Sequence, residues 1–597
     1  MRTCRIAMVQ MNPIVGDLNG NVQAMTGWLK AARQAQADIV VFPELVVTGY
    51  PPEDLVLRQS FLRDTQQALH QFVQHCRQIT TVVGFVEERK TRSQKYRTSM
   101  VVPSGPRHIF NAAAVIQDRR VIARCQKTLL PDYGVFDESR YFESGREALV
   151  CRIGGIGVGV NICEDIWYAD GPTRDQVNHG SAELIININA SPFHKGKSAT
   201  RERMLSRRAR ENGVMLSYTN MVGGQDEIVF DGNSILVNPQ GQVIARAKAF
   251  EEDLLVADLQ FPGTVPKYLA ASTTTKKRVP VNFTIKNVVA KGHLGPAVKK
   301  PIMRQPLPKL NSVEEVYLAL VTGVRDYVRK NGFSTVVIGI SGGIDSALTA
   351  VIATDAIGAE NVTGVFMPSK FTSRESREDS TKLMKALKCS FLTIPIGATW
   401  ESYLKLLTPA FGRRPHDATE ENLQARIRGT LLMALSNKFG HLVLTTGNKS
   451  EMSVGYATLY GDMAGGFAVI KDVPKMLVYE LTRYRNRRAV DHLGRELIPL
   501  RIIERAPSAE LKADQTDQDT LPSYDVLDRI LEAYVEEDRS LEEIVKLGMK
   551  PKIVRQVMAM VDRSEYKRRQ APIGIKITPR ALGKDRRMPL TNRYLKH

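Results

Sequence analysis

The sequence predicts an α/β protein of two domains, the second of them a doubly wound parallel sheet, and three observations lead to this prediction. The chain has 597 residues, more than one hydrophobic core usually serves. Short apolar runs of strand length alternate with helical patterns in both halves. From Phe261 to Lys309, prolines and basic residues interrupt this alternation. We therefore predict domains over residues 1–265 and 311–597, joined by a linker over residues 266–310.

The composition is typical of a soluble globular protein. Hydrophobic residues make up 43% of the chain, but no apolar run reaches the roughly 18 residues of a membrane helix. The N-terminus resembles a first strand and lacks the apolar core of a signal peptide. Six cysteines are scattered without a C-x-x-C pair, which argues against a zinc site or a disulfide framework. We expect a cytoplasmic protein that has no membrane partner.

The formal net charge of +20 allows two interpretations. One is nucleic-acid binding, and the other is an enzyme whose substrates carry phosphates. The basic residues are spread along the chain, and no signature of a zinc finger, an RNA-recognition core or a basic zipper is present. We favour the enzyme and predict no nucleic-acid partner.

The first domain contains repeated short strands, which predict an α/β or stacked-sheet architecture. A polar, basic stretch from Arg89 to His108 interrupts them, and we interpret it as a surface excursion. The expected strands are Ile6–Met11, Asp38–Phe42, Thr81–Val86, Ala113–Ile116, Val121–Gln126, Ile156–Ile162 and Leu184–Ile188.

Three of these strands end at a chemically reactive side chain: Glu44, Lys127 or Cys163. Before Cys163, strand alternation places Gly157, Gly159 and Asn161 on the cysteine's face. A face of small residues leaves room for a ligand, whereas structural cysteines usually lie among large apolar neighbours. Each of the three residues taken singly has an ordinary structural explanation.

The flanking residues favour a functional site. The stretches P-E-L at 43–45, K-T-L-L-P-D-Y-G-V-F-D-E at 127–138 and N-I-C-E-D at 161–165 resemble the nitrilase-superfamily amidases, the second stretch resembling the glutamine-hydrolysing branch. The resemblance implies a nitrilase-like αββα sandwich with a Glu-Lys-Cys triad. It also implies glutamine contacts at Tyr133, Ser191 and Lys197, although Lys197 could belong to a solvated basic loop.

The residue types suit amide hydrolysis. A thiol attacks as its thiolate, so we expect Lys127 to lower the pKa of Cys163. Glu44 serves as general base, and Lys127 with the amide after Cys163 holds the tetrahedral oxyanion. Glu138 orients Lys127, shares the proton transfer or forms a structural ion pair.

The second domain contains a glycine-rich loop between a strand and a helix. The β-branched run 335–340 predicts a buried strand, and apolar spacing from Ile344 predicts a helix packed against it. Backbone amides and the helix dipole in such a turn favour a phosphate. The loop lacks the Lys-Ser/Thr ending of a Walker motif and resembles the S-G-G-x-D-S loop of the ATP pyrophosphatases. The expected ATP contacts are Gly339, Ile340, Ser341, Gly342, Gly343, Ile344, Asp345 and Ser346.

Further strands and helices alternate after this loop, which predicts a doubly wound parallel sheet with its ligands at the carboxyl ends of the strands. We expect Ser312 and Glu315 to form a capping box on the domain's first helix. The expected strands after the loop are Val362–Pro368, Phe391–Ile396 and His441–Thr445.

Three motifs narrow the resemblance to the NAD synthetases: N-L-Q-A-R at 422–426, T-T-G-N-K-S-E at 445–451 and G-Y-x-T-x-Y-G-D at 455–462. With an amidase domain before it, nearly the whole chain resembles the glutamine-dependent branch. The resemblance implies that ATP adenylates deamido-NAD and that ammonia from glutamine then displaces AMP. It implies Mg²⁺ at Asp345 and Glu451, and an ATP contact at Thr446. The implied deamido-NAD contacts are Asn422, Glu451, Lys471 and Lys567, although Lys567 could belong to a solvated basic helix end.

Ammonia released into bulk water would be protonated, so we also predict a sealed passage and coupling between the sites. We expect a homo-oligomer. The alternatives are another ATP pyrophosphatase, including the tRNA-modifying ones, a non-catalytic nucleotide sensor, and a related amidotransferase that acts on a different carboxylate. The first would need an RNA-binding appendage or sulfur-relay cysteines, whereas Cys389 is the only cysteine of the second half.

Overall fold

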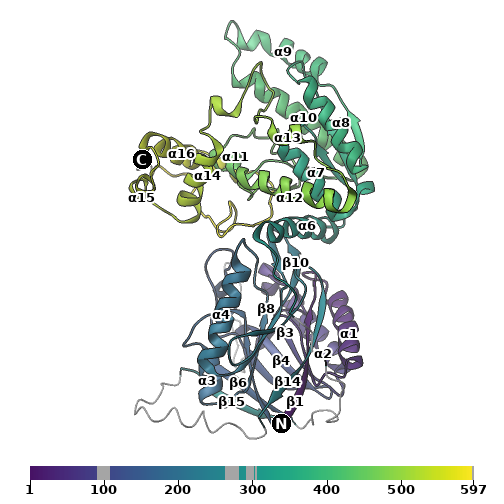
Figure 1. The fold of residues 1–597 in the computed structure, drawn as a ribbon, viewed down its shortest axis with the longest axis vertical. Coiled ribbons are helices and arrows are strands. Elements are labelled where there is room, and N and C mark those ends of the chain that lie inside the picture. The colour runs from purple at the N-terminus through teal and green to yellow at the C-terminus, as the bar shows by residue number, and fades with distance from the viewer. Residues whose placement is uncertain (90–107, 263–281, 291–301, 303–305, 595–597) are drawn as a thin grey trace, which may run out of the picture. The chain divides into compact units, whose positions relative to one another are not determined.

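The computed structural model describes residues 1–89, 108–262, 282–290, 302 and 306–594. The predicted excursion at 89–108 falls almost entirely outside these residues. The chain divides into two compact units (Figure 1). The first comprises Met1–Gln225 and Phe230–Lys309, and the second comprises Asp226–Val229 and Leu310–His597.

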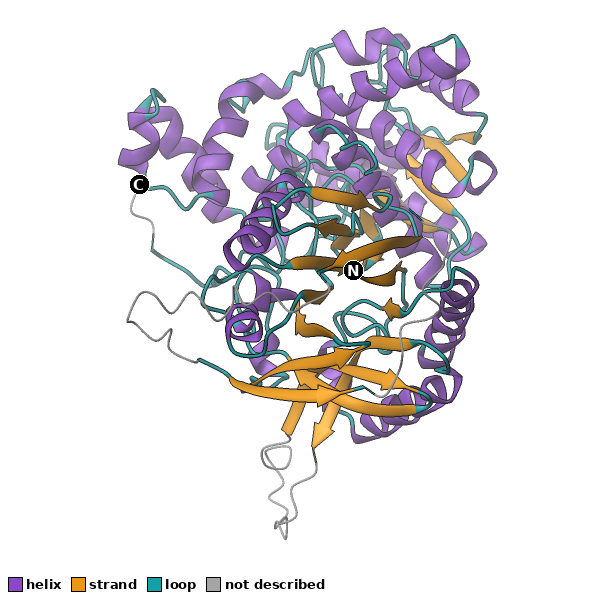
Figure 2. Ribbon diagram, turned by 60° about the horizontal axis from the view of Figure 1, so that its bottom comes forward, coloured by secondary structure: helices purple, strands orange, loops and turns teal. Residues whose placement is uncertain are grey.

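The first unit contains two large mixed sheets, whose strands are orange in Figure 2. The six-stranded sheet has the order β14 (Asp253–Phe261), β1 (Arg2–Gln10), β2 (Ile39–Val41), β3 (Thr80–Arg89), β4 (His108–Gln117), β5 (Arg120–Gln126). The seven-stranded sheet has the order β13 (Val243–Arg246), β12 (Ile235–Val237), β9 (Met215–Asn220), β8 (Leu184–Asn189), β7 (Ile156–Ile162), β6 (Glu147–Ile153), β15 (Thr284–Val289). A separate pair joins β10 (Val222–Gln225) to β11 (Ile228–Asp231).

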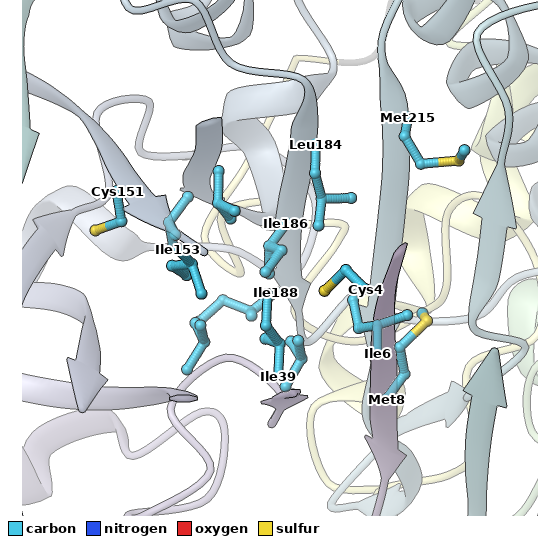
Figure 3. Packing of buried hydrophobic residues seen from close by; sticks show 14 of the residues in the cluster. Cys4, Ile6, Met8, Ile39, Cys151, Ile153, Leu184, Ile186, Ile188 and Met215 are labelled. Atoms are coloured by element: carbon cyan, nitrogen blue, oxygen red, sulfur yellow. The ribbon is translucent and has the colours of Figure 1, made fainter. Parts of the chain in front are cut away.

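The main core of this unit lies between the two large sheets. Figure 3 shows Cys4, Ile6 and Met8 of β1 in one cluster with Ile186 and Ile188 of β8. Because strand side chains alternate between faces, the opposite faces are free to bind helices. Helices α1 (Leu18–Gln34) and α2 (Gln59–His75) cover the six-stranded sheet, and α3 (Pro172–Asn178) and α4 (Lys197–Asn212) cover the seven-stranded one. The predicted αββα sandwich is confirmed.

Strand β15 lies inside the stretch that the sequence predicts as linker. It pairs in parallel with β6 from Thr284 to Val289, so this part of the chain is an edge strand of the first unit. Its strand character is hard to see in the sequence because β15 lies at a sheet edge, where most of its side chains stay partly exposed.

The second unit is built on a five-stranded parallel sheet, and the predicted doubly wound architecture is confirmed. The strand order is β18 (Ser390–Thr393), β17 (Val362–Phe366), β16 (Val336–Gly339), β19 (Leu442–Thr445), β20 (Phe467–Ala468). The order reverses between β16 and β19, and in open α/β sheets ligands bind at the carboxyl ends of the strands on either side of such a point. Helix α6 begins at Ser312 as predicted, but its cap is Asn311, which accepts bonds from the amides of Val313 and Glu314.

Helices surround this sheet, and others form a C-terminal cluster with its own apolar core. Around the sheet are α6 (Ser312–Lys330), α7 (Ile344–Ile357), α8 (Arg374–Leu387), α9 (Gly397–Phe411), α10 (Ala418–Phe439), α12 (Lys475–Leu493) and α13 (Leu500–Glu504). Helix α11 (Lys449–Val454) packs in the C-terminal cluster. The later helices are α14 (Tyr524–Leu531), α15 (Leu541–Lys546), α16 (Pro551–Arg563) and α17 (Glu565–Arg568). Among the described residues, none of these helices combines the length and apolar character needed to span a bilayer.

Candidate active sites

The first candidate site brings together the residues that end β2, β5 and β7. The Nζ atom of Lys127 lies 2.8 Å from Oε1 of Glu44 and 2.8 Å from Oε1 of Glu138. All three side chains are buried, as is Cys163. The Glu44 carboxylate also accepts bonds from Asn111 Nδ2 at 2.7 Å and from the amide of Ala190 at 2.8 Å. These bonds hold the carboxylate in one orientation beside the ammonium.

Cys163 lies at a sharp turn where β7 ends. Its φ of +45° is left-handed, a conformation that non-glycine residues adopt rarely and often at functional sites. A short 3₁₀ helix, Cys163–Ile166, begins at this residue. The strain is consistent with a nucleophile held at a strand end.

Burial raises the pKa of the Cys163 thiol well above its ordinary value of 9.0. The Glu44 carboxylate raises it further, and the Lys127 ammonium lowers it. The predicted effect of Lys127 therefore has the right sign but is outweighed. The resting thiol is protonated, and a base must remove its proton before it can attack.

The buried ion pairs keep Lys127 charged. Burial alone would lower the pKa of Lys127, but the carboxylates of Glu138 and Glu44 raise it well above 10.5. Burial raises the pKa of Glu138 to about 7, while Lys127 opposes the rise. The hydroxyl of Tyr50 donates to Glu138 at 2.8 Å. A positive charge is thus fixed next to the cysteine.

The structure places the predicted glutamine contacts in different surroundings. The hydroxyl of Tyr133 lies 3.0 Å from both carboxylate oxygens of Glu164, the residue after Cys163. The amide of Ser191 donates to Asn220 at 2.9 Å. Lys197 begins α4 and lowers the pKa of Glu164, which burial raises. Glu164 was not predicted, although its place next to the nucleophile in the sequence is a usable signal.

The glycine-rich loop of the second unit connects β16 to α7. Gly342 has φ +83°, and a Cβ there would lie 2.7 Å from both the Cα and the carbonyl oxygen of Ser376. The backbone conformation and the close contact with Ser376 therefore require glycine at this position, whether or not a phosphate binds near it. The hydroxyls of Ser341 and Ser346 lie 3.1 Å apart, and Ser341 Oγ accepts the amide of Gly343 at 3.2 Å. These bonds pre-form the turn.

A cavity of about 310 Å³ opens at this loop, within the second unit. All the predicted ATP contacts, from Gly339 to Ser346 together with Thr446, line it. Of the four predicted deamido-NAD contacts, only Glu451 does so. Arg428 and Lys475 also line the cavity, so basic residues contribute to its wall.

The two predicted metal ligands, Asp345 and Glu451, meet at Lys475. The Lys475 ammonium bonds to Asp345 Oδ2 and lies 3.2 Å from Glu451 Oε1. Asn448 Nδ2 donates to Asp345 Oδ1 at 2.9 Å. Burial raises the pKa of Glu451 to about 7, with Lys475 lowering it and Asp345 raising it. Lys475 was missed, although a lysine at the first position of a helix opposes the helix dipole and could have signalled a functional role.

The other three predicted deamido-NAD contacts bond to protein groups. Asn422 Oδ1 accepts the hydroxyl of Thr458 at 2.7 Å. Lys471 Nζ donates to the carbonyl of Pro572 at 2.6 Å. Lys567 Nζ lies 2.9 Å from the carbonyls of Gly455 and Ala457, in the turn that follows α11.

Comparison with known proteins identifies both units. Residues 5–266 match the carbon-nitrogen hydrolase family, and residues 316–571 match the NAD synthase family. The chain is 48% identical to the glutamine-dependent NAD(+) synthetase of Thermotoga maritima, covering 100% of this chain and 99% of that one. It is 44% identical to the enzyme of the same name from Aquifex aeolicus, covering 99% and 100%. The chain belongs to the glutamine-dependent NAD(+) synthetase family.

A solved structure agrees with membership of the glutamine-dependent NAD(+) synthetases, and a second one agrees with the fold. The synthetase of Acinetobacter baumannii, solved with ADP, is 40% identical, with a TM-score of 0.72 and 99% of each chain covered. The synthetase of Cytophaga hutchinsonii, at 20% identity and a TM-score of 0.78, shares the fold. Within this family, the cysteine site falls in the carbon-nitrogen hydrolase part and the glycine-rich loop in the NAD synthase part.

Proposed function

We propose that the chain converts deamido-NAD to NAD at the expense of ATP, with glutamine as nitrogen donor, and that the residues described above perform the two half-reactions. The observation that carries the proposal is the presence, in one chain of this family, of both a buried Glu44–Lys127–Cys163 site and a cavity at the glycine-rich loop. The overall reaction hydrolyses glutamine to glutamate and releases AMP and pyrophosphate.

Glutamine hydrolysis begins at the protonated thiol of Cys163. Glu44 removes the proton of Cys163, and the thiolate attacks the side-chain carbonyl of glutamine. The oxyanion that forms is held by the ammonium of Lys127 and the amide of Glu164. When the C–N bond breaks, Glu44 returns the proton to the leaving ammonia, and water then hydrolyses the thioester to glutamate. Glu138 keeps Lys127 in place, which the 2.8 Å contact between them supports.

Recognition of glutamine requires partners for its two charges. The ammonium of Lys197 suits the α-carboxylate, and the carboxylate of Glu164, held by Tyr133, suits the α-ammonium. Ser191 is buried beside Asn220 and completes the proposed contacts.

In the second unit, the loop from Gly339 to Ser346 binds the phosphates of ATP, with Thr446 at its side. Asp345 and Glu451 fit Mg²⁺, because both are oxygen donors that already share one cationic partner and line the cavity. Bound Mg²⁺ would offset the charge of the phosphates. The deamido-NAD carboxylate attacks the α-phosphorus of ATP, pyrophosphate leaves, and ammonia then displaces AMP from the acyl adenylate. Contacts of deamido-NAD with Asn422, Glu451, Lys471 and Lys567 stay predictions.

The homo-oligomer, the cytoplasmic location, the sealed passage and the coupling of the two sites stay predictions.

The test is an assay with glutamine, ATP, Mg²⁺ and deamido-NAD that follows NAD, AMP and pyrophosphate. Cys163→Ala should abolish NAD formation from glutamine and leave formation from ammonium salts intact. A Cys163→Ala enzyme that still uses glutamine would refute the nucleophile. Equal NAD formation with ATP omitted would refute the adenylation step.

A further inference from the structure

Asp165 is a buried carboxylate that touches both reactive segments of the first unit. It lies two residues after Cys163 and is not exposed. Its Oδ2 atom accepts the amide of Ile162 at 3.0 Å. Its Oδ1 atom accepts the amides of Thr128 and Leu129 at 3.0 and 2.9 Å, and the hydroxyl of Thr128 at 2.5 Å. One side chain thus joins the residue before Cys163 to the two residues after Lys127.

This link matters because the two segments belong to different sheets. Lys127 follows β5 of the six-stranded sheet, and Cys163 follows β7 of the seven-stranded sheet. No ladder of strand hydrogen bonds sets the distance between residues on two stacked sheets, so side-chain packing must do so. Asp165 supplies direct hydrogen bonds between the two sheets, at the ends of the strands that carry Lys127 and Cys163.

The residue type suits this position. A carboxylate has two acceptor oxygens, and all four groups that contact Asp165 are donors. An asparagine would direct its own N–H group at one of these donors. Cys163 holds a left-handed backbone, and such strain persists only where neighbouring contacts enforce it. The bond from Ile162 is one of those contacts.

We propose that Asp165 is a positioning residue for glutamine hydrolysis, which sets the separation of Cys163 from Lys127 by binding the backbone of both segments. The proposal rests on the proposed function of Cys163 and Lys127. A misplacement of about 1 Å between reacting groups can cost about 100-fold in rate. Asp165 therefore acts on the catalytic step and leaves glutamine binding largely unaffected.

The first experiment measures NAD formation by Asp165→Asn from glutamine and, separately, from ammonium salts. We expect kcat with glutamine to fall about 100-fold, the KM for glutamine to change less than about threefold, and the rate with ammonia to stay within about twofold. Asp175→Asn is the matched control. Asp175 is equally buried and accepts the amides of Asn282 and Phe283 at 2.7 and 2.9 Å, so it tests the loss of a buried carboxylate elsewhere in the unit. It should keep the wild-type ratio of the two rates.

A milder pair of variants covers the case in which Asp165→Asn fails to fold. Thr128→Val removes one donor to Asp165 and should lower kcat with glutamine about tenfold, whereas Thr128→Ser keeps the hydroxyl and should restore it. Equal losses with both nitrogen donors, or equal losses in Thr128→Val and Thr128→Ser, would overturn the positioning role. Full glutamine activity in Asp165→Asn would overturn it too, provided that Cys163→Ala has lost that activity. Glutamine activity in Cys163→Ala would instead refute the proposed function itself.

Discussion

The two units each contain a buried lysine between two carboxylates, and the difference between these clusters separates two kinds of chemistry. Lys127 bridges Glu44 and Glu138, and Lys475 bridges Asp345 and Glu451. In the first cluster, the side chains of Lys127 and Glu44 are 0% exposed and that of Glu138 is 5% exposed. In the second, Lys475 is 1% exposed but its carboxylates are 18% and 17% exposed and line the nucleotide cavity.

The two clusters have similar charges but differ in the exposure of their carboxylates. The sealed carboxylates of the first cluster can exchange protons only with their neighbours and with a small substrate beside Cys163. The open carboxylates of the second cluster can share a metal ion with the phosphates of a large substrate. We therefore propose that the first cluster performs proton transfer and that the second cluster neutralises charge.

Removing the sealed lysine should have the largest effect. Lys127→Met deletes an oxyanion donor, which typically costs about 10²–10³ in rate, and leaves Glu44 and Glu138 without their buried partner. We expect NAD formation from glutamine to fall about 10³-fold and the free energy of unfolding to fall by about 3–5 kcal/mol. NAD formation from ammonium salts, measured alongside, should persist. An equal loss with both donors would mean that the two clusters do not differ in role.

Substitution of a carboxylate in the open cluster should lower NAD formation from either nitrogen donor. Asp345→Asn removes a proposed Mg²⁺ ligand, and we expect the rate of NAD formation to fall about 100-fold with glutamine and with ammonia alike. Raising the Mg²⁺ concentration should recover part of that rate. Asp355→Asn is the control, because Asp355 lies on the same helix but pairs with Arg485 outside the cavity lining. If Asp345→Asn lost activity with glutamine alone, the metal assignment would be wrong.

The free energy of unfolding should depend on pH because of the raised pKa of Glu138 in the sealed cluster. Burial raises the pKa of Glu138 from 4.5 to about 7, so folding takes up a proton between these pH values. The stability that this proton uptake contributes is present below pH 4.5 and is lost as the pH rises through about 7. Relative to Glu138→Gln, whose side chain is neutral at every pH, the wild type should lose about 3 kcal/mol over this range, at about 1.4 kcal/mol per pKa unit. Denaturant unfolding of both proteins at several pH values measures it, and a constant difference would contradict the raised pKa.

The smallest expected effect concerns Lys567. Its ammonium binds the carbonyls of Gly455 and Ala457 in the turn after α11, so Lys567→Met should cost about 1–3 kcal/mol of stability. Thermal unfolding and the KM for deamido-NAD, measured together, separate this structural role from the predicted substrate contact. A KM that rises more than about tenfold with unchanged stability would favour the substrate contact.

Local sequence patterns were sufficient for the two α/β units, the glycine-rich loop and the three strand-end residues Glu44, Lys127 and Cys163. These features are encoded over short stretches, because strand alternation and a strand–glycine–helix turn involve neighbouring residues only. Family resemblance added the candidate substrate contacts, of which Glu451 and Thr446 line the cavity.

Family resemblance implied that Glu44 and Lys127, 83 positions apart, belong to one site, although no local pattern indicates their contact. Only the tertiary structure showed that Asp345 meets Lys475, which lies 130 positions away. The pKa of the Cys163 thiol depends on its burial, which the sequence does not specify. Burial raises this pKa by more than Lys127 lowers it. The edge strand β15 and the turn held by Lys567 likewise depend on hydrogen-bond partners that distant segments supply.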